Sequence, residues 1–170
     1  MTPPLICVVE DEGIVAADIK ECLGRLGYST TTVSSGSEAL ARVPELLPDL
    51  VLMDIMLPGR LDGIETAIEI RERCQIPVVF LTAHADDATL TRAKTAKPFG
   101  YIIKPFEERG LHTIIELALH KHRMDRSEQQ HAEQERQLRR REVHGRQDAV
   151  PRKGEVTRHA AALEEVLLPQ

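Results

Sequence analysis

The feature that most constrains the fold is a series of five short apolar or β-branched runs, spaced almost evenly along the first part of the chain. Four of them are nearly continuous in apolar residues, as in strands buried on both faces of a parallel sheet. The run that begins at Tyr28 is more polar, which suits an edge strand. The runs begin 22 to 28 residues apart, and they are Leu5–Val9, Tyr28–Val33, Leu50–Met53, Val78–Leu81 and Tyr101–Ile103.

A helical pattern follows each of these runs. Gly27 closes the first pattern, and Asp86–Thr95 forms a fourth pattern that is poor in large apolar residues. The second, Ser37–Val43, is expected to end before Pro44, because the residue before a proline disfavours the helical conformation. Five repeats of strand and helix predict an α/β fold, an open doubly wound parallel sheet with helices on both faces.

The chain changes character near residues 123–126. Residues 1–123 carry 13 Lys+Arg, 18 Asp+Glu and all the aromatic residues, whereas residues 124–170 carry 9 of each charge and only 14 apolar residues in 47. The second segment cannot build a core of its own. We therefore predict one domain over residues 1–123 and a charged, largely helical extension over residues 124–170, without a recognised output domain.

Within the extension, Gln129–Val143 favours helix but lacks a sustained apolar heptad, so a strong coiled coil is not expected there. Gly145 is expected to break this helix, and Glu155–Leu168 is expected to form a short terminal one. The final helix of the domain is expected to run past residue 123 into this extension.

Composition excludes several classes of protein. The net charge of −5 gives no support to nucleic-acid binding, and no apolar run approaches the ~20 residues that a membrane-spanning helix needs. The N-terminus has no basic stretch and no cleavage site typical of a signal peptide. The three cysteines form no metal-binding pattern and are interpreted as reduced packing residues, so we expect a cytoplasmic protein with no membrane insertion.

Polar side chains follow four of the predicted strands at the ends where ligands bind in such sheets. Glu10 and Asp11 follow the first run, Asp54 the third, Thr82 the fourth and Lys104 the fifth. Any one of them alone is an ordinary cap or loop residue. Their convergence at one edge of the sheet predicts a functional site.

The residue types indicate the chemistry of this site. Clustered carboxylates repel one another unless a cation neutralises them, and hard oxygen ligands with room for water suit Mg²⁺. A carboxylate beside a metal ion and a lysine is placed to attack phosphorus and to carry the phosphoryl group. We therefore predict that Asp54 is a phosphoacceptor, with Lys104 opposite it.

Five strings at these positions closely resemble the receiver domain of bacterial two-component response regulators, over residues 4–123. The strings are Val8–Glu12, Leu52–Gly59, Asp62–Gly63, Phe80–Ala83 and Tyr101–Phe106. The resemblance implies a flavodoxin-like sheet with strand order 2-1-3-4-5. It also implies a phosphoprotein that acts in signal transduction and catalyses only its own phosphorylation and dephosphorylation.

By this resemblance, Asp54 accepts a phosphoryl group from a histidine kinase or a phosphotransfer protein. Asp11 and Asp54 would bind Mg²⁺ together with the backbone carbonyl of Met56, and Glu10 would act largely through water. Glu10 departs from the family pattern, in which Asp is commoner. Its extra methylene is expected to alter the metal geometry slightly.

The resemblance also assigns a switch. Thr82 would hydrogen-bond the phosphoryl group, and Lys104 would pair with it, after a cis peptide bond to Pro105. Tyr101 would turn inward when Thr82 moves. The signal would pass to a protein partner, or to a second copy of the chain, through the surface of the fourth helix, fifth strand and fifth helix.

Two other classes of function stay open on the sequence alone. One is a DNA-binding transcriptional regulator whose extension holds an unrecognised binding element. The other is a Mg²⁺-dependent phosphatase with an aspartyl-phosphate intermediate. Such a phosphatase would require a second acidic residue two positions after its nucleophile, where this chain has Met56.

Overall fold

All five runs form strands of one parallel sheet in the computed structural model, which describes residues 2–83 and 86–148. The strand order is β2-β1-β3-β4-β5, so the predicted flavodoxin-like topology is confirmed and β2 lies at an edge. The strands are β1 (Leu5–Val9), β2 (Ser29–Val33), β3 (Leu50–Asp54), β4 (Val78–Thr82) and β5 (Gly100–Ile103).

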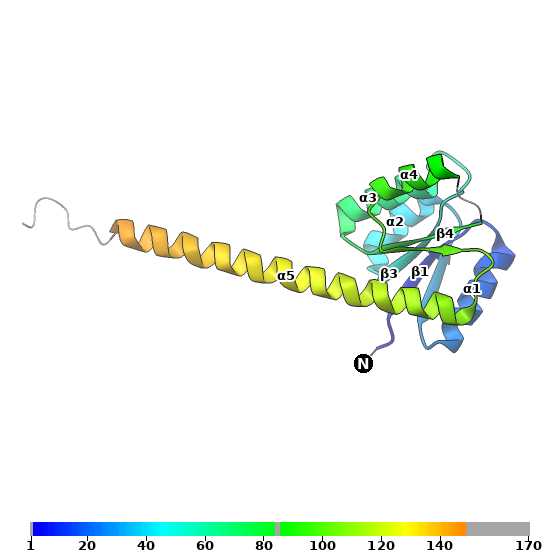
Figure 1. Ribbon diagram of the computed structural model, residues 1–170, viewed down its shortest axis with the longest axis horizontal. Helices are drawn as coiled ribbons and strands as arrows, with labels where there is room; N and C mark the ends of the chain where they lie inside the picture. Colours follow the sequence, from blue (N-terminus) through cyan, green and yellow to red (C-terminus); the bar gives the residue numbers. More distant parts are fainter. Residues whose placement is uncertain (1, 84–85, 149–170) are drawn as a thin grey trace, which may run out of the picture. The chain divides into compact units, whose positions relative to one another are not determined.

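A helix follows each strand, and the helices cover both faces of the sheet (Figure 1). Those that pack on one face are α2, α3 and α4, and those on the other are α1 and the first part of α5. Their bounds are α1 (Gly13–Arg25), α2 (Gly36–Leu46), α3 (Gly63–Cys74), α4 (Asp87–Thr95) and α5 (Glu108–Asp148). No helix in this part of the chain is long and apolar enough to cross a bilayer.

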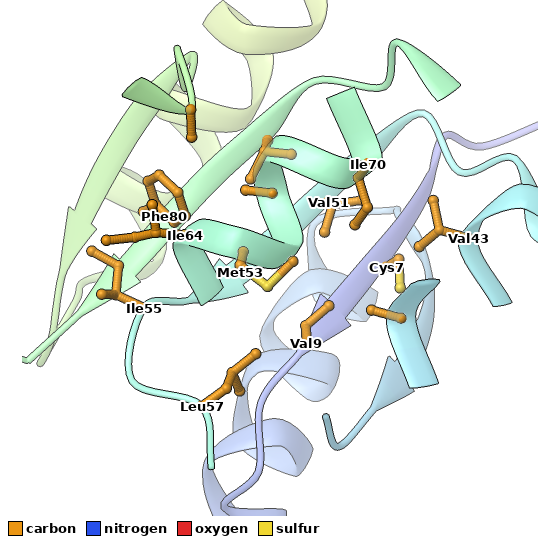
Figure 2. Close-up of a cluster of buried hydrophobic side chains, with 14 of the residues drawn as sticks. Cys7, Val9, Val43, Val51, Met53, Ile55, Leu57, Ile64, Ile70 and Phe80 are labelled. Carbon is orange, nitrogen blue, oxygen red and sulfur yellow. The ribbon is translucent and has the colours of Figure 1, made fainter. Parts of the chain in front are cut away.

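The core consists of two apolar layers, one on each face of the sheet. Successive residues of a strand point to opposite faces, so Cys7 and Val9 face α2 and α3, while Ile6 and Val8 face α1 and α5. Figure 2 shows the first of these layers, in which Val51, Met53 and Phe80 continue the row. Burial raises the pKa of the Cys7 thiol to about 11, so Cys7 packs as a neutral side chain.

Two expectations about helix ends were wrong. Pro44 lies inside α2, which continues to Leu46, although proline removes one helical hydrogen bond. The helix ends two residues later, where Leu47 adopts a left-handed conformation and donates its N–H to the carbonyl of Val43. Gly145 does not end α5, which continues to Asp148. One glycine costs a helix only about 1 kcal/mol, which a long helix tolerates.

The chain divides into two units after Met124. The helix α5 is continuous from the first unit into the second, as expected from the sequence. Every residue from 126 to 143 is exposed. The short helix expected over Glu155–Leu168 lies outside the described residues.

The start of α3 packs against the backbone at the end of β3. Asp62 and Glu65 form a capping box, in which the Asp62 carboxylate accepts from the Glu65 N–H and the Glu65 carboxylate accepts from the Asp62 N–H. Gly63 donates its N–H to the carbonyl of Ile55 at 3.0 Å. A Cβ atom at Gly63 would lie 1.8 Å from the carbonyl oxygen of Asp54, so only glycine fits there.

We expect Gly63→Ala to lower the free energy of unfolding by about 3 kcal/mol, because the new methyl group has to push α3 away from β3. Gly24→Ala is the matched control. No atom lies within 4 Å of a Cβ at Gly24, in the last turn of α1, so this change should stabilise the domain by up to about 0.5–1 kcal/mol. Urea unfolding measures both. Equal effects of the two substitutions would contradict the close approach at Gly63.

Candidate functional site

The carboxyl ends of four parallel strands bring the predicted site residues to one edge of the sheet. Glu10 and Asp11 follow β1, Asp54 and Thr82 are the last residues of β3 and β4, and Lys104 follows β5. The strand ladder fixes this arrangement: Ile55 N–H donates to the carbonyl of Leu81 and Lys104 N–H to that of Thr82, at 3.1 and 2.8 Å. The peptide bond between Lys104 and Pro105 is cis, as the resemblance implied.

Lys104 connects the two buried carboxylates of this edge. Its Nζ lies 2.6 Å from Oε2 of Glu10 and 3.1 Å from Oδ2 of Asp54. Burial disfavours the charged ammonium, but the hydrogen bonds and charges of the two carboxylates outweigh it and raise the pKa of Lys104. The stabilisation from this shift is present below the pKa of an unfolded lysine and is lost as the pH rises through the folded one.

The three acidic side chains are near enough to share a cation. One carboxylate oxygen from each of Glu10, Asp11 and Asp54 lies within 4.8 Å of the others. Glu10 and Asp54 are buried, whereas Asp11 is exposed. Three negative charges face the single ammonium of Lys104, so the cluster retains an excess of negative charge that suits a hard divalent cation.

The Asp54 carboxylate is held in place from two sides. Its Oδ1 accepts a hydrogen bond from the Met56 N–H at 2.9 Å, while Oδ2 faces Lys104. The neighbouring Glu10 is anchored in the same way, since its Oε1 accepts from the Glu12 N–H at 3.1 Å. The backbone after β1 and β3 therefore orients both carboxylates before any ligand binds.

Thr82 is buried beside this cluster with an unused hydroxyl group. Only 4% of the residue is exposed, and its Oγ1 has no hydrogen-bond partner among the described residues. A buried hydroxyl without a partner costs free energy that a new acceptor would recover. Thr82 is thus ready to bond an acceptor that appears next to Asp54.

Tyr101 does not belong to the acidic cluster itself. It lies opposite Phe80 in the ladder of β4 and β5, with the two ring centroids 6.0 Å apart. The side chain is half-buried against the core layer that α2, α3 and α4 cover, and this burial raises the pKa of its phenol. Tyr101 can therefore act on the site only through its neighbours in the sheet.

The edge around Asp54 also carries exposed apolar side chains. Ile14, Met56 and Ile103 are 81%, 70% and 69% exposed, and each lies close in sequence to a site residue. A cleft opens next to Lys104, between α1 and the chain after β5. Its lining combines charged side chains, those of Asp18, Arg25, Lys104 and Glu108, with apolar ones, those of Val15, Cys22, Ala83, Pro105 and Phe106.

Sequence reasoning missed two features of the site. It gave Lys104 only the phosphoryl group as a partner, and it did not foresee the direct ion pair between Lys104 and Glu10. It also took Asp62–Gly63 only as a matching string, without the packing of Gly63 on Asp54. The pattern of polar residues after each strand gives no signal for either feature, because both depend on contacts that form only in the tertiary structure.

An open parallel α/β sheet with buried acids and a lysine at its carboxyl edge places a charged binding site where doubly wound folds bind their ligands. Residues 6–116 match the model of the response regulator receiver domain. The chain therefore belongs to the response regulator receiver family, as its five strings indicated.

Named relatives are similar to this chain over stretches of about the same length. The chain is 33% identical over 116 residues to the transcriptional regulatory protein AfsQ1 of Streptomyces coelicolor, covering 68% of this chain and 51% of that protein. It is 35% identical over 122 residues to the transcriptional regulatory protein PdtaR of Mycobacterium tuberculosis, covering 71% of this chain and 59% of that protein. It thus spans about half the length of the relatives it matches.

A solved structure agrees with the fold. The signal receiver domain of a modulated diguanylate cyclase from Desulfovibrio desulfuricans is 42% identical to this chain, with a TM-score of 0.70. The alignment covers 72% of this chain and 98% of that one. The described receiver fold is therefore shared with a solved member of the family.

Proposed function

We propose that Asp54 receives a phosphoryl group from the phosphohistidine of a sensor kinase or a phosphotransfer protein. The observation that carries this proposal is the buried Asp54 carboxylate, oriented by the Met56 N–H and placed 3.1 Å from the Lys104 ammonium. A carboxylate held in this way needs no rearrangement to meet phosphorus. Positioning and charge neutralisation account for most catalysis of phosphoryl transfer.

In the transfer, an oxygen of Asp54 forms a bond to phosphorus while the bond from phosphorus to the histidine nitrogen breaks. Negative charge on the transferred group is matched by Lys104, which stays protonated because its carboxylate partners raise its pKa. The unused hydroxyl of Thr82 would donate a hydrogen bond to one of the new oxygens. The chain thereby catalyses its own modification and needs no further nucleophile.

The proposal includes Mg²⁺ as cofactor. Asp11 and Asp54 would bind it directly with the Met56 backbone carbonyl, and Glu10 would contribute through water. The bound ion would supply positive charge to the phosphoryl oxygens. The excess negative charge of the three carboxylates, with oxygens within 4.8 Å, supports this role.

The central test is phosphorylation of Asp54→Asn by acetyl phosphate. We expect incorporation of phosphate to fall to background, because an amide is a far weaker nucleophile than a carboxylate. Glu72→Gln, on the exposed surface of α3 and outside the cleft, should retain wild-type incorporation. Labelled phosphate that hydroxylamine releases from the protein is the measurement. Wild-type labelling of Asp54→Asn, with the fold intact, would refute the assignment.

A titration with Mg²⁺ followed by NMR tests the metal site separately. We expect Asp11→Ala to weaken binding about tenfold or more, because this substitution removes a direct charged ligand. Glu10→Ala should weaken binding less, since Glu10 is buried and already paired with Lys104. If Asp11→Ala bound Mg²⁺ as tightly as the wild type, the proposed ligand set would be wrong.

In the proposed response to phosphorylation, a conformational change passes from Thr82 to the surface formed by α4, β5 and α5. Movement of Thr82 toward a phosphoryl group would vacate space into which the half-buried Tyr101 can turn. The helix α4 is suited to move, because Ala93 is its one buried residue. An exposed ion pair of 2.6 Å between Arg92 of α4 and Asp62 connects α4 to the cap of α3.

Beryllofluoride, a mimic of the phosphoryl group, tests this output. We expect it to shift amide signals across residues 86–118 and to change self-association of the wild-type protein, because a local charge biases a two-state element. Tyr101→Ala should lose the change in self-association while still binding the mimic at Asp54. NMR and sedimentation are the measurements. Unshifted signals over 86–118 and an unchanged mass would contradict the proposed surface.

A protein donor agrees with the surroundings of Asp54. The cleft beside Lys104, with its apolar and charged side chains, and the exposed Ile14, Met56 and Ile103 present a surface that a helical partner can cover. Such exposed apolar side chains around a charged site are typical of protein-binding surfaces. We therefore propose that the donor docks over this edge of the sheet.

A second candidate function is DNA-binding regulation of transcription, since AfsQ1 and PdtaR are named transcriptional regulatory proteins. The match to the receiver family ends at residue 116, and the extension has equal numbers of basic and acidic residues. The charge balance makes this the weaker proposal. A salt-dependent gel shift given by the phosphorylated protein would favour it.

A further inference from the structure

One face of α5 carries a column of side chains at intervals of seven residues. Leu117, Met124, His131 and Leu138 follow one another at this spacing on one continuous helix. The three apolar members are 64%, 50% and 60% exposed. Side chains seven residues apart lie on nearly the same face of a helix, and such a repeat is the basis of coiled-coil packing.

A groove on the surface of α5 has the geometry of a coiled-coil contact. It is lined by Gln134, Gln137, Leu138 and Arg141, which stand at positions i, i+3, i+4 and i+7. Four residues at this spacing form the hole that receives one side chain of a facing helix. With Leu138 at heptad position a, they occupy the positions d, g, a and d around a hole for an a side chain.

We propose that a second copy of this chain covers this face, so that the two α5 helices form a parallel, in-register coiled coil. Leu138 of each copy would then pack in the groove of the other. The column meets itself only in this arrangement, because an antiparallel pair would place it against the polar d positions. Those d positions are His120, Ser127, Gln134 and Arg141.

The charges beside the column favour the same orientation. In a parallel pair each g side chain faces the e side chain five residues further along the partner. This places Arg123 opposite Glu128, and Gln130 opposite Glu135, with no like charges between g and e positions, whereas Arg141 at d faces its own copy. An antiparallel pair would bring the e positions Glu128, Glu135 and Glu142 toward one another, which is repulsive.

Exposure of the helix supports the need for a partner. Every residue from 126 to 143 is exposed, and a helix that is polar on most sides gains little stability by itself. The polar d column limits the gain from pairing, because burying polar groups without partners is costly. We therefore expect the α5 helices of two copies to associate reversibly. This association does not require phosphorylation of Asp54.

Sedimentation equilibrium of the full chain tests the proposal. The wild type should be in concentration-dependent equilibrium between one and two copies. Leu138→Glu should weaken association about tenfold or more, because each dimer loses two apolar contacts and gains two facing charges. His131→Leu should strengthen it by a similar factor. Gln129→Glu, at the outward f position, adds the same charge as Leu138→Glu and should leave association unchanged.

Cysteine cross-linking tests the orientation. In a Cys74→Ser background, which leaves only the buried Cys7 and Cys22, His131→Cys should oxidise to a covalent dimer, because its two copies face each other in a parallel pair. Gln129→Cys should not. The proposal is overturned if the wild type stays monomeric up to about 10⁻⁴ M, if Leu138→Glu associates like the wild type, or if His131→Cys cross-links no better than Gln129→Cys. None of these outcomes depends on phosphorylation, so they leave the assignment of Asp54 untouched.

Discussion

The ammonium of Lys104 is the interaction on which the site depends. It bridges Glu10 and Asp54, two carboxylates that are buried at the ends of neighbouring strands and would otherwise repel each other. Removing one member of a buried group of charges usually costs more than the group contributes, because an uncompensated charge remains. Lys104 and the Met56 N–H therefore hold the buried Asp54 carboxylate in one orientation.

The same edge of the sheet contains a second buried polar group, the hydroxyl of Thr82. This hydroxyl has no hydrogen-bond partner within residues 2–83 and 86–148, and Thr82 ends the strand beside the one that Asp54 ends. On the other side of β4, Tyr101 is only half-buried, and α4 contributes little to the core. A fold with its firmest packing around β1 and β3 and its weakest around α4 has a natural place for a change in conformation.

Much of the domain could be predicted from local pattern. Buried parallel strands must be apolar throughout, so Leu50–Asp54 and Val78–Thr82 stand out from their surroundings, and the boundaries differ from the predicted ones by one residue. Polar residues at the ends of such strands are equally visible, which is why Asp54 and Lys104 could be selected. Helix ends were harder to predict. Pro44 did not end α2, because the helix continues for only two residues after it.

The sequence by itself determined the order of strands and helices and the residue types at the carboxyl edge, because both follow from periodicity and from the direction of parallel strands. The pairing of Lys104 with Glu10 was decided by tertiary structure, since the two residues lie 94 positions apart. So was the requirement for glycine at position 63, which comes from the backbone of β3. The sequence also predicted that the last helix continues past residue 123, but its tertiary packing decided that Leu117 and Met124 stay exposed on α5 while Leu111 and Ile115 are buried.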